Sequence, residues 1–503
     1  MKWPWQKRTA KRNPRKSSAK RFYDAAMAGR FTMDWVTAPI PNDVAIDAGL
    51  SALRARAREK HRNNGHIKAY VRACHTNIVG HRGVILQSRV TDRGGLKPDR
   101  LARQAIEAGW KDWGRKGGPV DKAERRSWRQ FQVDVITSCC TDGEFFAIID
   151  GDRGHPVRLT TVDPETIPVS YSEDLGNGRY IRQGIEFYDN GRVRGYWMSL
   201  ADPKKSRHGY AAAYGNGTAD LKFVPAKSMI HVYLPEFAIQ NRGVPWVAPG
   251  LLALGMLHGY HEAELIAARI AASQMGWITE AASGDTYEGD DPDADDTDDG
   301  LDEIISDPGT YRRLPYGVDV KPPDTSRPNS AFEGFVKANV RGLAAAWGAG
   351  YAEISGDYSD ANYSALRAAA LVEQESWKLL QEWLIESFHE PIFRQWVELS
   401  IDMGYLTIAG AQPAGPLTDY LAHGWQPRRW AWVDPQKEMA AQEKALANGL
   451  KSRSEIIRDM GRDPDDVWQE IHDENAILES LGIVLQPVQS TESAPEPAPN
   501  DEE

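Results

Sequence analysis

The spacing of hydrophobic and polar positions divides the chain into a mixed N-terminal half and a helical C-terminal half. Segments rich in Arg and Ala predict helices over 45–63, 65–79, 97–110 and 121–141. Short β-branched and aromatic runs predict strands over 145–149, 157–162, 181–188, 192–199 and 221–233. Asp189-Asn190-Gly191 fits a hairpin turn, because Asn and Gly tolerate a positive φ. The expected fold class is therefore α+β and predominantly helical.

Long helices dominate the chain from residue 249 onward. One is expected over 249–279 with apolar stripes on two sides, a second over 330–349, and a third from Tyr363, kinked by Pro391. A polar loop marked by Gly, 350–362, lies between the last two. Cap signals then delimit three C-terminal helices, at Asp434-Pro435, Asn448-Gly449, Ser452 with Glu455, and Asp463-Pro464, the last running to Leu481.

Composition indicates a large folded protein with unevenly placed charge. The chain has 503 residues, a net charge of −11, 41% hydrophobic and 26% charged residues, so several domains are expected. The most apolar stretch, 244–257, is too short to span a bilayer, no secretory signal is recognisable, and three Cys suit a reducing, cytosolic compartment. Residues 1–30 form a basic arm, 285–307 an acidic insert, and 486–503 a Pro- and Glu-rich tail expected to be disordered.

No catalytic or metal-binding constellation is recognisable. The phosphate-loop motif GxxxxGK[ST] and the nucleophile motif GxSxG are absent. His258 and His261 share one helix face, but without HExxH a helix-surface cluster is the preferred interpretation. Residues 295–306 approach a calcium loop, but Ser306 stands where a bidentate Glu is needed. We expect no cofactor, no metal ion and no enzymatic activity.

Arginines, tryptophans and cysteines each have an ordinary structural interpretation. The arginines of the first two helices could touch nucleic acid, but pairing with carboxylates at the surface or between subunits is preferred; they are Arg54, Arg56, Arg58, Arg62 and Arg72. The 17 Trp mostly occupy apolar stripes and are expected in the core. Cys139 and Cys140 are expected to be buried structural thiols.

Five segments, through their order and spacing, carry a family resemblance. They are Arg56–Asn64 with Ala69-Tyr70-Val71, Arg242–Pro249, Leu314–Val320 with Pro322-Pro323, Asp357–Arg367, and Trp432–Glu438 with Asn448-Gly449 and Gly461–Asp465. Over about residues 45–482 the chain resembles the lambda-type portal proteins of tailed bacteriophages. The third segment is degraded, since Tyr316 and Val318 replace a Gly and a Glu of the pattern. The basic arm and the acidic insert lie outside the likeness.

The resemblance implies the portal fold and its role. A ring of about twelve subunits would surround a channel at one capsid vertex, and double-stranded DNA would pass through it, without sequence specificity, during packaging and ejection. The implied partners are further copies of the chain, the DNA, the packaging ATPase (terminase large subunit), a head–tail connector or adaptor, and the major capsid and scaffolding proteins, with no membrane. The implied location is the virion portal vertex, and the host cytoplasm during assembly.

The same resemblance divides the chain into named parts. These are an N-terminal arm (1–44), a wing (45–248 and 363–433), two stem helices (249–279 and 326–349), a clip (280–325), a tunnel loop (350–362), a crown (434–485) and a tail (486–503).

Two groups of site residues follow from this division. Carboxylates of the tunnel loop would repel DNA phosphates while nearby cations damp the motion of the DNA; this channel group is Lys337, Arg341, Glu353, Asp357, Tyr358, Ser359, Asp360 and Asn362. The clip group would present negative charge to a basic surface of the motor or connector; it is Asp290, Asp291, Asp293, Asp295, Asp296, Asp298, Asp299, Asp302 and Glu303.

Two other functions stay open on the sequence alone. One is an enzyme of DNA packaging, such as a nuclease or a motor subunit, which a metal-dependent cleavage assay would detect. The other is a different structural capsid or connector protein, which an image of a ring with a DNA-wide channel would exclude.

Overall fold

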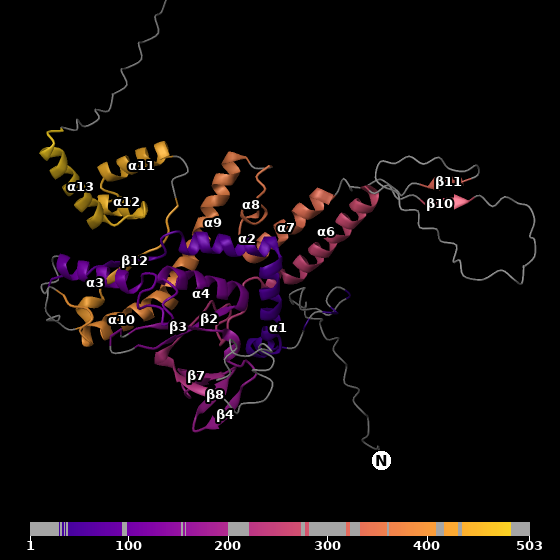
Figure 1. The fold of residues 1–503 in the computed structure, drawn as a ribbon, viewed down its shortest axis with the longest axis horizontal. Coiled ribbons are helices and arrows are strands. Elements are labelled where there is room, and N and C mark those ends of the chain that lie inside the picture. The colour runs from indigo at the N-terminus through magenta and orange to yellow at the C-terminus, as the bar shows by residue number, and fades with distance from the viewer. Residues whose placement is uncertain are drawn as a thin grey trace, which may run out of the picture.

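The computed structural model describes residues 30, 33–34, 36, 39–92, 98–151, 154–155, 157–199, 221–272, 277–280, 318–321, 332–359, 362–408, 417–430 and 435–483. Its elements follow the expected α+β order, with a helix-rich body, a β-rich end and a projecting helix pair (Figure 1).

The described part of the chain up to residue 142 contains the helices α1 (Asn42–Asn63), α2 (Gly65–Cys74), α3 (Arg100–Trp113) and α4 (Trp128–Asp142). A π-helical turn, His75–Val79, completes the helix expected over 65–79. The expected start of the fourth helix at residue 121 is wrong. Asp121 accepts hydrogen bonds from the backbone N–H groups of residues 123, 125 and 126, which holds a turn, and Ser127 with Gln130 forms the capping box that starts α4.

The strands build antiparallel sheets. One sheet has the order β3-β2-β9 and comprises β2 (Glu144–Ile149), β3 (Leu159–Val162) and β9 (Met229–Tyr233). A larger sheet runs β4-β5-β6-β7-β8, with β4 (Glu173–Gly176), β5 (Arg179–Arg182), β6 (Ile185–Phe187), β7 (Val193–Ser199) and β8 (Leu221–Pro225). The hairpin at 189–191 is confirmed between β6 and β7, with Gly191 at φ 79°.

Two expected strands are each divided. The run 181–188 turns back on itself, because Gln183 and Gly184 adopt φ values of 53° and 79° and separate β5 from β6. The run 221–233 is interrupted by a 3₁₀ turn, Ala226–Ser228, so that β8 and β9 belong to different sheets.

A helix pair projects from the body (Figure 1) and consists of α6 (Leu251–Ala272) and α7 (Phe332–Trp347). Tyr260 contacts Phe332 and Phe335 across the pair, with ring centroids 5.7 and 5.0 Å apart. At its base the indole N–H of Trp347 donates to the Val247 carbonyl at 3.2 Å. The first helix is shorter than the expected 249–279, because Trp277–Glu280 form strand β10, paired with β11 (Val318–Lys321).

The remaining helices follow most of the C-terminal predictions, but the helix at 351–355 within the expected polar loop was not predicted, and the expected cap Asp434 lies outside the described residues. A short helix α8 (Tyr351–Ser355) precedes α9 (Tyr363–Leu384). A π-helical turn, Ile385–His389, then interrupts the long helix, and α10 (Glu390–Asp402) begins one residue before Pro391. The C-terminal bundle comprises α11 (Pro435–Ala447), α12 (Arg453–Asp459) and α13 (Pro464–Ser480), and Ser452 and Asp463 cap the last two as expected. Strands β1 (Ile85–Ser88) and β12 (His423–Gln426) pair and join two segments that are more than 300 residues apart in the sequence, as the 339-residue separation of the Gln87–Gln426 hydrogen bond shows.

The main core is aromatic, as expected for the tryptophans. Trp110 contacts Trp113, Trp128 and Trp396 at centroid distances of 4.5, 5.3 and 5.2 Å. Cys139 and Cys140 are buried free thiols, which confirms their structural interpretation.

Candidate functional site

Asp357 organises the loop that follows α7 and α8. Its Oδ1 accepts the backbone N–H and the hydroxyl of Ser359 at 3.0 and 2.6 Å, and its Oδ2 accepts the Tyr351 hydroxyl at 2.9 Å. These hydrogen bonds to the charged form, first those from Ser359, hold the pKa of Asp357 below its usual range. The carboxylate therefore shapes the loop from within and stays ionised.

The two cations expected in this region, Lys337 and Arg341, lie near Asp357 and its partner Tyr351, and each contacts another side chain. Lys337 Nζ lies 2.9 Å from Glu333 Oε1 and 3.6 Å from Asp357 Oδ2. The Arg341 guanidinium lies 5.2 Å from the centroid of the Tyr351 ring, in cation–π geometry. The structure thus brings Lys337, Arg341 and Asp357 together on one side of the loop.

The other channel-group residues occupy different positions. Tyr358, Ser359 and Asn362 are exposed, and Asn362 caps α9 by accepting the Ser364 N–H at 2.8 Å. Asp360 lies outside the described residues. So do the clip group, from Asp290 to Glu303, and the calcium-loop-like segment.

Glu353 on α8 turns toward the body and meets Asn77. The Asn77 side-chain N–H donates to Glu353 Oε1 at 2.9 Å, and the Asn77 Oδ1 accepts from Arg428 and from the Trp430 indole. The Gln381 amide donates to the Asn77 carbonyl at 2.8 Å. Asn77 therefore joins α8, the π-helical turn 75–79, α9 and the segment 428–430.

Buried charge surrounds this junction. Burial, and then the charge of Glu353, raises the pKa of Glu373, and burial lowers the pKa of Arg428 while Glu353 opposes that shift. A Cβ at Gly350 would lie 2.2 Å from a Glu373 carboxylate oxygen, so a larger residue there would displace the end of the Glu373 side chain. Glu353 and Arg428 thus both contact Asn77 and attract each other electrostatically.

A buried ionic cluster around Glu144 was not expected from the sequence. Glu144 is fully buried and pairs with Arg54, with Arg242 at 2.6 Å and with His231 at 2.8 Å. Burial raises the pKa of Glu144, but the two arginines and His231 outweigh it and hold that pKa well below its usual range. The sequence signal that could have indicated this cluster is Arg242, which begins one of the segments that carry the family resemblance, Arg242–Pro249.

The arginines of α1 accordingly pair inside the chain. Arg54 is 1% exposed, and Arg58 lies 2.5 Å from Asp142 and 2.9 Å from Asp163. The expectation of surface or inter-subunit pairing is therefore wrong for these two arginines. Within the described ranges, no group of His, Cys, Asp and Glu could hold a metal ion, and no helix is long and apolar enough to cross a membrane.

Comparison with known proteins assigns the chain to a family. The description "Phage portal protein, lambda family" matches residues 28–381. The chain belongs to the lambda family of phage portal proteins. Over 437 residues this portal chain is 31% identical to the "Probable portal protein" of Halomonas phage phiHAP-1, covering 86% of the chain and 81% of that protein.

Solved structures with weaker likeness were also found. A chain of the virion of a native gene transfer agent particle has a TM-score of 0.39 and 14% identity, covering 85% of this chain and 95% of that one. An HK97 family phage portal protein from Corynebacterium diphtheriae has a TM-score of 0.26 and 12% identity, covering 70% and 98%. Family membership makes the portal chain a structural, non-enzymatic component of a phage particle.

Proposed function

We propose that the chain forms a closed ring of about twelve subunits at a unique capsid vertex, and that double-stranded DNA passes through its channel during packaging and ejection. Family membership supports the portal assignment. The observation that carries the ring is the apolar surface of the projecting helix pair: Leu252, Met256, Leu265, Ile266 and Phe335 are 80%, 71%, 66%, 50% and 51% exposed.

Burying these exposed apolar side chains against another subunit would stabilise the assembled particle. Each such side chain contributes about 1.5–3 kcal/mol when fully buried. A ring in which each subunit presents one face to the next covers every copy of the surface, because a heterologous contact that closes leaves no free end. We therefore assign α6 and α7 to the stem.

The other parts of the ring follow the expected division, namely wing (45–248 and 363–433), clip (280–325), tunnel loop (350–362) and crown (434–485). In the proposed tunnel loop, Asp357 accepts hydrogen bonds from Ser359 and Tyr351. Tyr358 and Ser359 are exposed, and we assign them to the side of the loop that faces the channel. The acidic clip residues would dock the packaging ATPase and then the connector, since their charge suits a basic partner surface.

Native mass measurement of the purified protein tests the ring. A closed species of about twelve subunits is expected. A chain that stays monomeric on its own and also in the presence of capsid and scaffolding proteins would contradict the proposal.

Packaging assays test the internal assignments. Changing Asp357 and Asp360 to Lys should leave rings intact but stall DNA packaging, whereas deleting 285–299 should weaken motor docking. Normal packaging by the first variant contradicts the tunnel-loop assignment, and normal docking by the second contradicts the clip assignment.

A further inference from the structure

A basic pocket lies where the C-terminal bundle meets the body. Three chain segments line it, namely 79–85, 426–429 and 460–462. Its volume is about 300 Å³, and its cationic and titratable lining residues are His81, Arg82, Arg428, Arg429 and Arg462. Among the described residues that line this pocket, none is an Asp or a Glu.

Turns anchored by glycine build the pocket from two of these segments. The turn Gly80-His81-Arg82-Gly83 has φ values of 73° and 77° at its glycines, so the two basic side chains stand on a tight bend. Gly461, at φ 80°, forms a similar bend directly before Arg462. Pairing of Ile85 with Gln426 in β1 and β12 brings the third segment alongside.

The arginines are held to different degrees. The Arg428 side chain is held in place by two contacts: its guanidinium donates a hydrogen bond to Asn77 Oδ1 and lies 5.3 Å from the Trp430 ring centroid. Arg462 pairs with the exposed Glu470. Arg82 and Arg429 are exposed and pair with no carboxylate in the described part of the chain.

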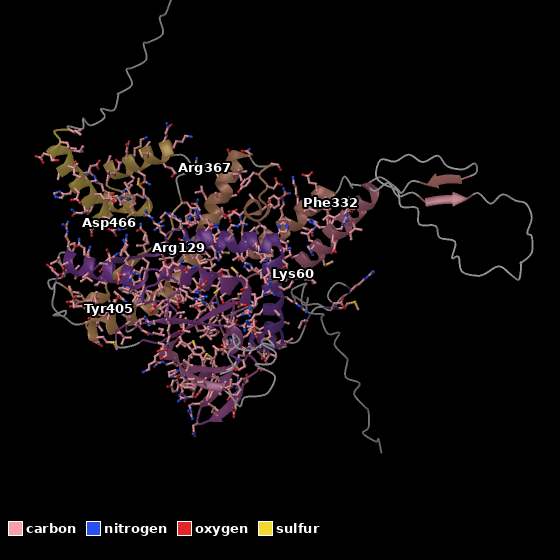
Figure 2. All side chains as sticks on the ribbon, viewed as in Figure 1. Lys60, Arg129, Phe332, Arg367, Tyr405 and Asp466 are labelled. Carbon is pink, nitrogen blue, oxygen red and sulfur yellow. The ribbon has the colours of Figure 1, made fainter. Side chains whose placement is uncertain are left out.

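Neighbouring groups extend and bound the positive charge. Arg129 on α4, labelled in Figure 2, donates to the Gly80 carbonyl at 3.3 Å and adds a further guanidinium beside the turn. Arg82 also borders the adjacent cleft, which Glu107, Asp463 and Asp466 line, and burial raises the pKa of Glu107 to about 7, so that this carboxyl is only partly ionised near neutral pH. Among the described lining residues, Arg82 and Arg429 therefore carry the uncompensated positive charge, because Arg462 pairs with Glu470 and Glu353 interacts with Arg428.

We propose that this pocket binds phosphate groups of double-stranded DNA. Several guanidinium groups facing one cavity repel one another unless an anion enters, and each offers a planar fork that matches two phosphate oxygens. Among the described lining residues none is a Phe, Tyr or Trp that could stack on a base, and the arginines match the phosphate backbone, so recognition is independent of sequence. The proposal rests on the conduit function proposed above and gives the DNA a binding site outside the tunnel loop.

Salt-dependent DNA binding by assembled rings tests the proposal. The probe is a fluorescently labelled 30-base-pair duplex, followed by anisotropy at several NaCl concentrations. The double variant Arg82→Ala/Arg429→Ala should bind about tenfold more weakly at low salt, and the slope of log K against log [NaCl] should fall by about 0.9 for each phosphate that the variant no longer neutralises. The matched control is Arg56→Ala/Arg192→Ala, which removes the same charge from exposed positions elsewhere and should bind as the wild type does.

Each other outcome is decisive. Equal affinity and slope in both double variants would overturn the phosphate site. If an acidic peptide of sequence 285–303 binds wild-type rings and the duplex does not, the occupant is an acidic segment of a neighbouring subunit and the DNA proposal is wrong. If wild-type rings fail to bind the duplex while particles containing them hold DNA, the conduit function stands and only this site fails; rings that form no DNA-filled particles contradict the conduit function itself.

Discussion

A 2.9 Å hydrogen bond joins the side chains of Asn77 and Glu353 across 276 residues of sequence. The same asparagine accepts from the Trp430 indole at 3.1 Å, so the proposed tunnel loop and the segment entering the proposed crown share one anchor. A substitution in the proposed tunnel loop should therefore alter the packing of segment 428–430, and a substitution in that segment should alter the packing of the loop.

Replacing Asn77 with Ala should loosen α8 without preventing assembly. The variant leaves Glu353, Arg428 and Trp430 without the amide that they share, and each unmet buried polar group costs about 1–3 kcal/mol. Hydrogen exchange should accelerate over 351–356 and 428–430. Asn63→Ala, which removes only an exposed hydrogen bond to Glu59, is the control and should leave exchange unchanged.

Charge introduced on the stem surface should block ring formation. Leu252→Glu/Met256→Glu places two carboxylates where we expect apolar contact with the next subunit, and native mass should show subunits in place of rings. Circular dichroism should be unchanged, because both side chains are exposed in the single chain. Leu101→Glu, at a 64% exposed position on α3, is the comparison. Intact rings from the stem variant would refute the stem interface.

Replacing Glu144 with Gln should strongly destabilise the fold. The variant keeps the shape of the side chain but removes the carboxylate that pairs with buried Arg242 and leaves buried Arg54 with Glu165 alone, and breaking a buried pair costs about 3–5 kcal/mol. Chemical denaturation measures the loss. Glu375→Gln removes an exposed ion pair with Lys378 and should change the free energy of unfolding by less than about 0.5 kcal/mol.

Acidification should destabilise the protein through His389. This fully buried imidazole packs against Trp128, Phe388 and Trp425, and burial lowers its pKa to about 4. The unfolded chain binds the proton at about pH 6.5, so stability is unaffected above that pH and falls by about 3 kcal/mol as the pH drops to about 4.

Denaturation of the His389→Gln variant at pH 7.5, 5.5 and 4.5 tests this dependence. The amide can still donate to the Leu384 carbonyl, as Nδ1 does at 3.1 Å, but it does not titrate. The decline between pH 6.5 and 4 should therefore be shallower than in the wild type. The exposed His472, replaced in the same way, should leave the wild-type decline intact; an equal slope in both variants would place the acid sensitivity elsewhere.

Local signals in the sequence predicted much of the fold. Caps at Ser452 and Asp463 and the turn at Asn190-Gly191 depend on residues a few positions apart, and all are confirmed. The turn at Gln183 was missed, because glutamine rarely adopts the positive φ of 53° found there.

Long-range relationships were not accessible in the same way. Asn77 finds its partners 276, 304 and 353 residues away, and Glu144 meets Arg242 98 residues later. No spacing rule connects such positions, and a buried charge in a sequence looks the same as an exposed one. The family resemblance supplied the architecture that these side chains hold together, and the roles of the channel and clip residues remain predictions.

The pairing of β1 with β12 can form only after both strands of a subunit have been synthesised. Residues 85–88 leave the ribosome early but must wait for residues 423–426 before their strand partner exists. The basic pocket beside this pair is completed later still, when 460–462 have been synthesised. A nascent or prematurely terminated chain without these residues therefore lacks this closure, so translation itself delays the finished surface until residue 462 has been made.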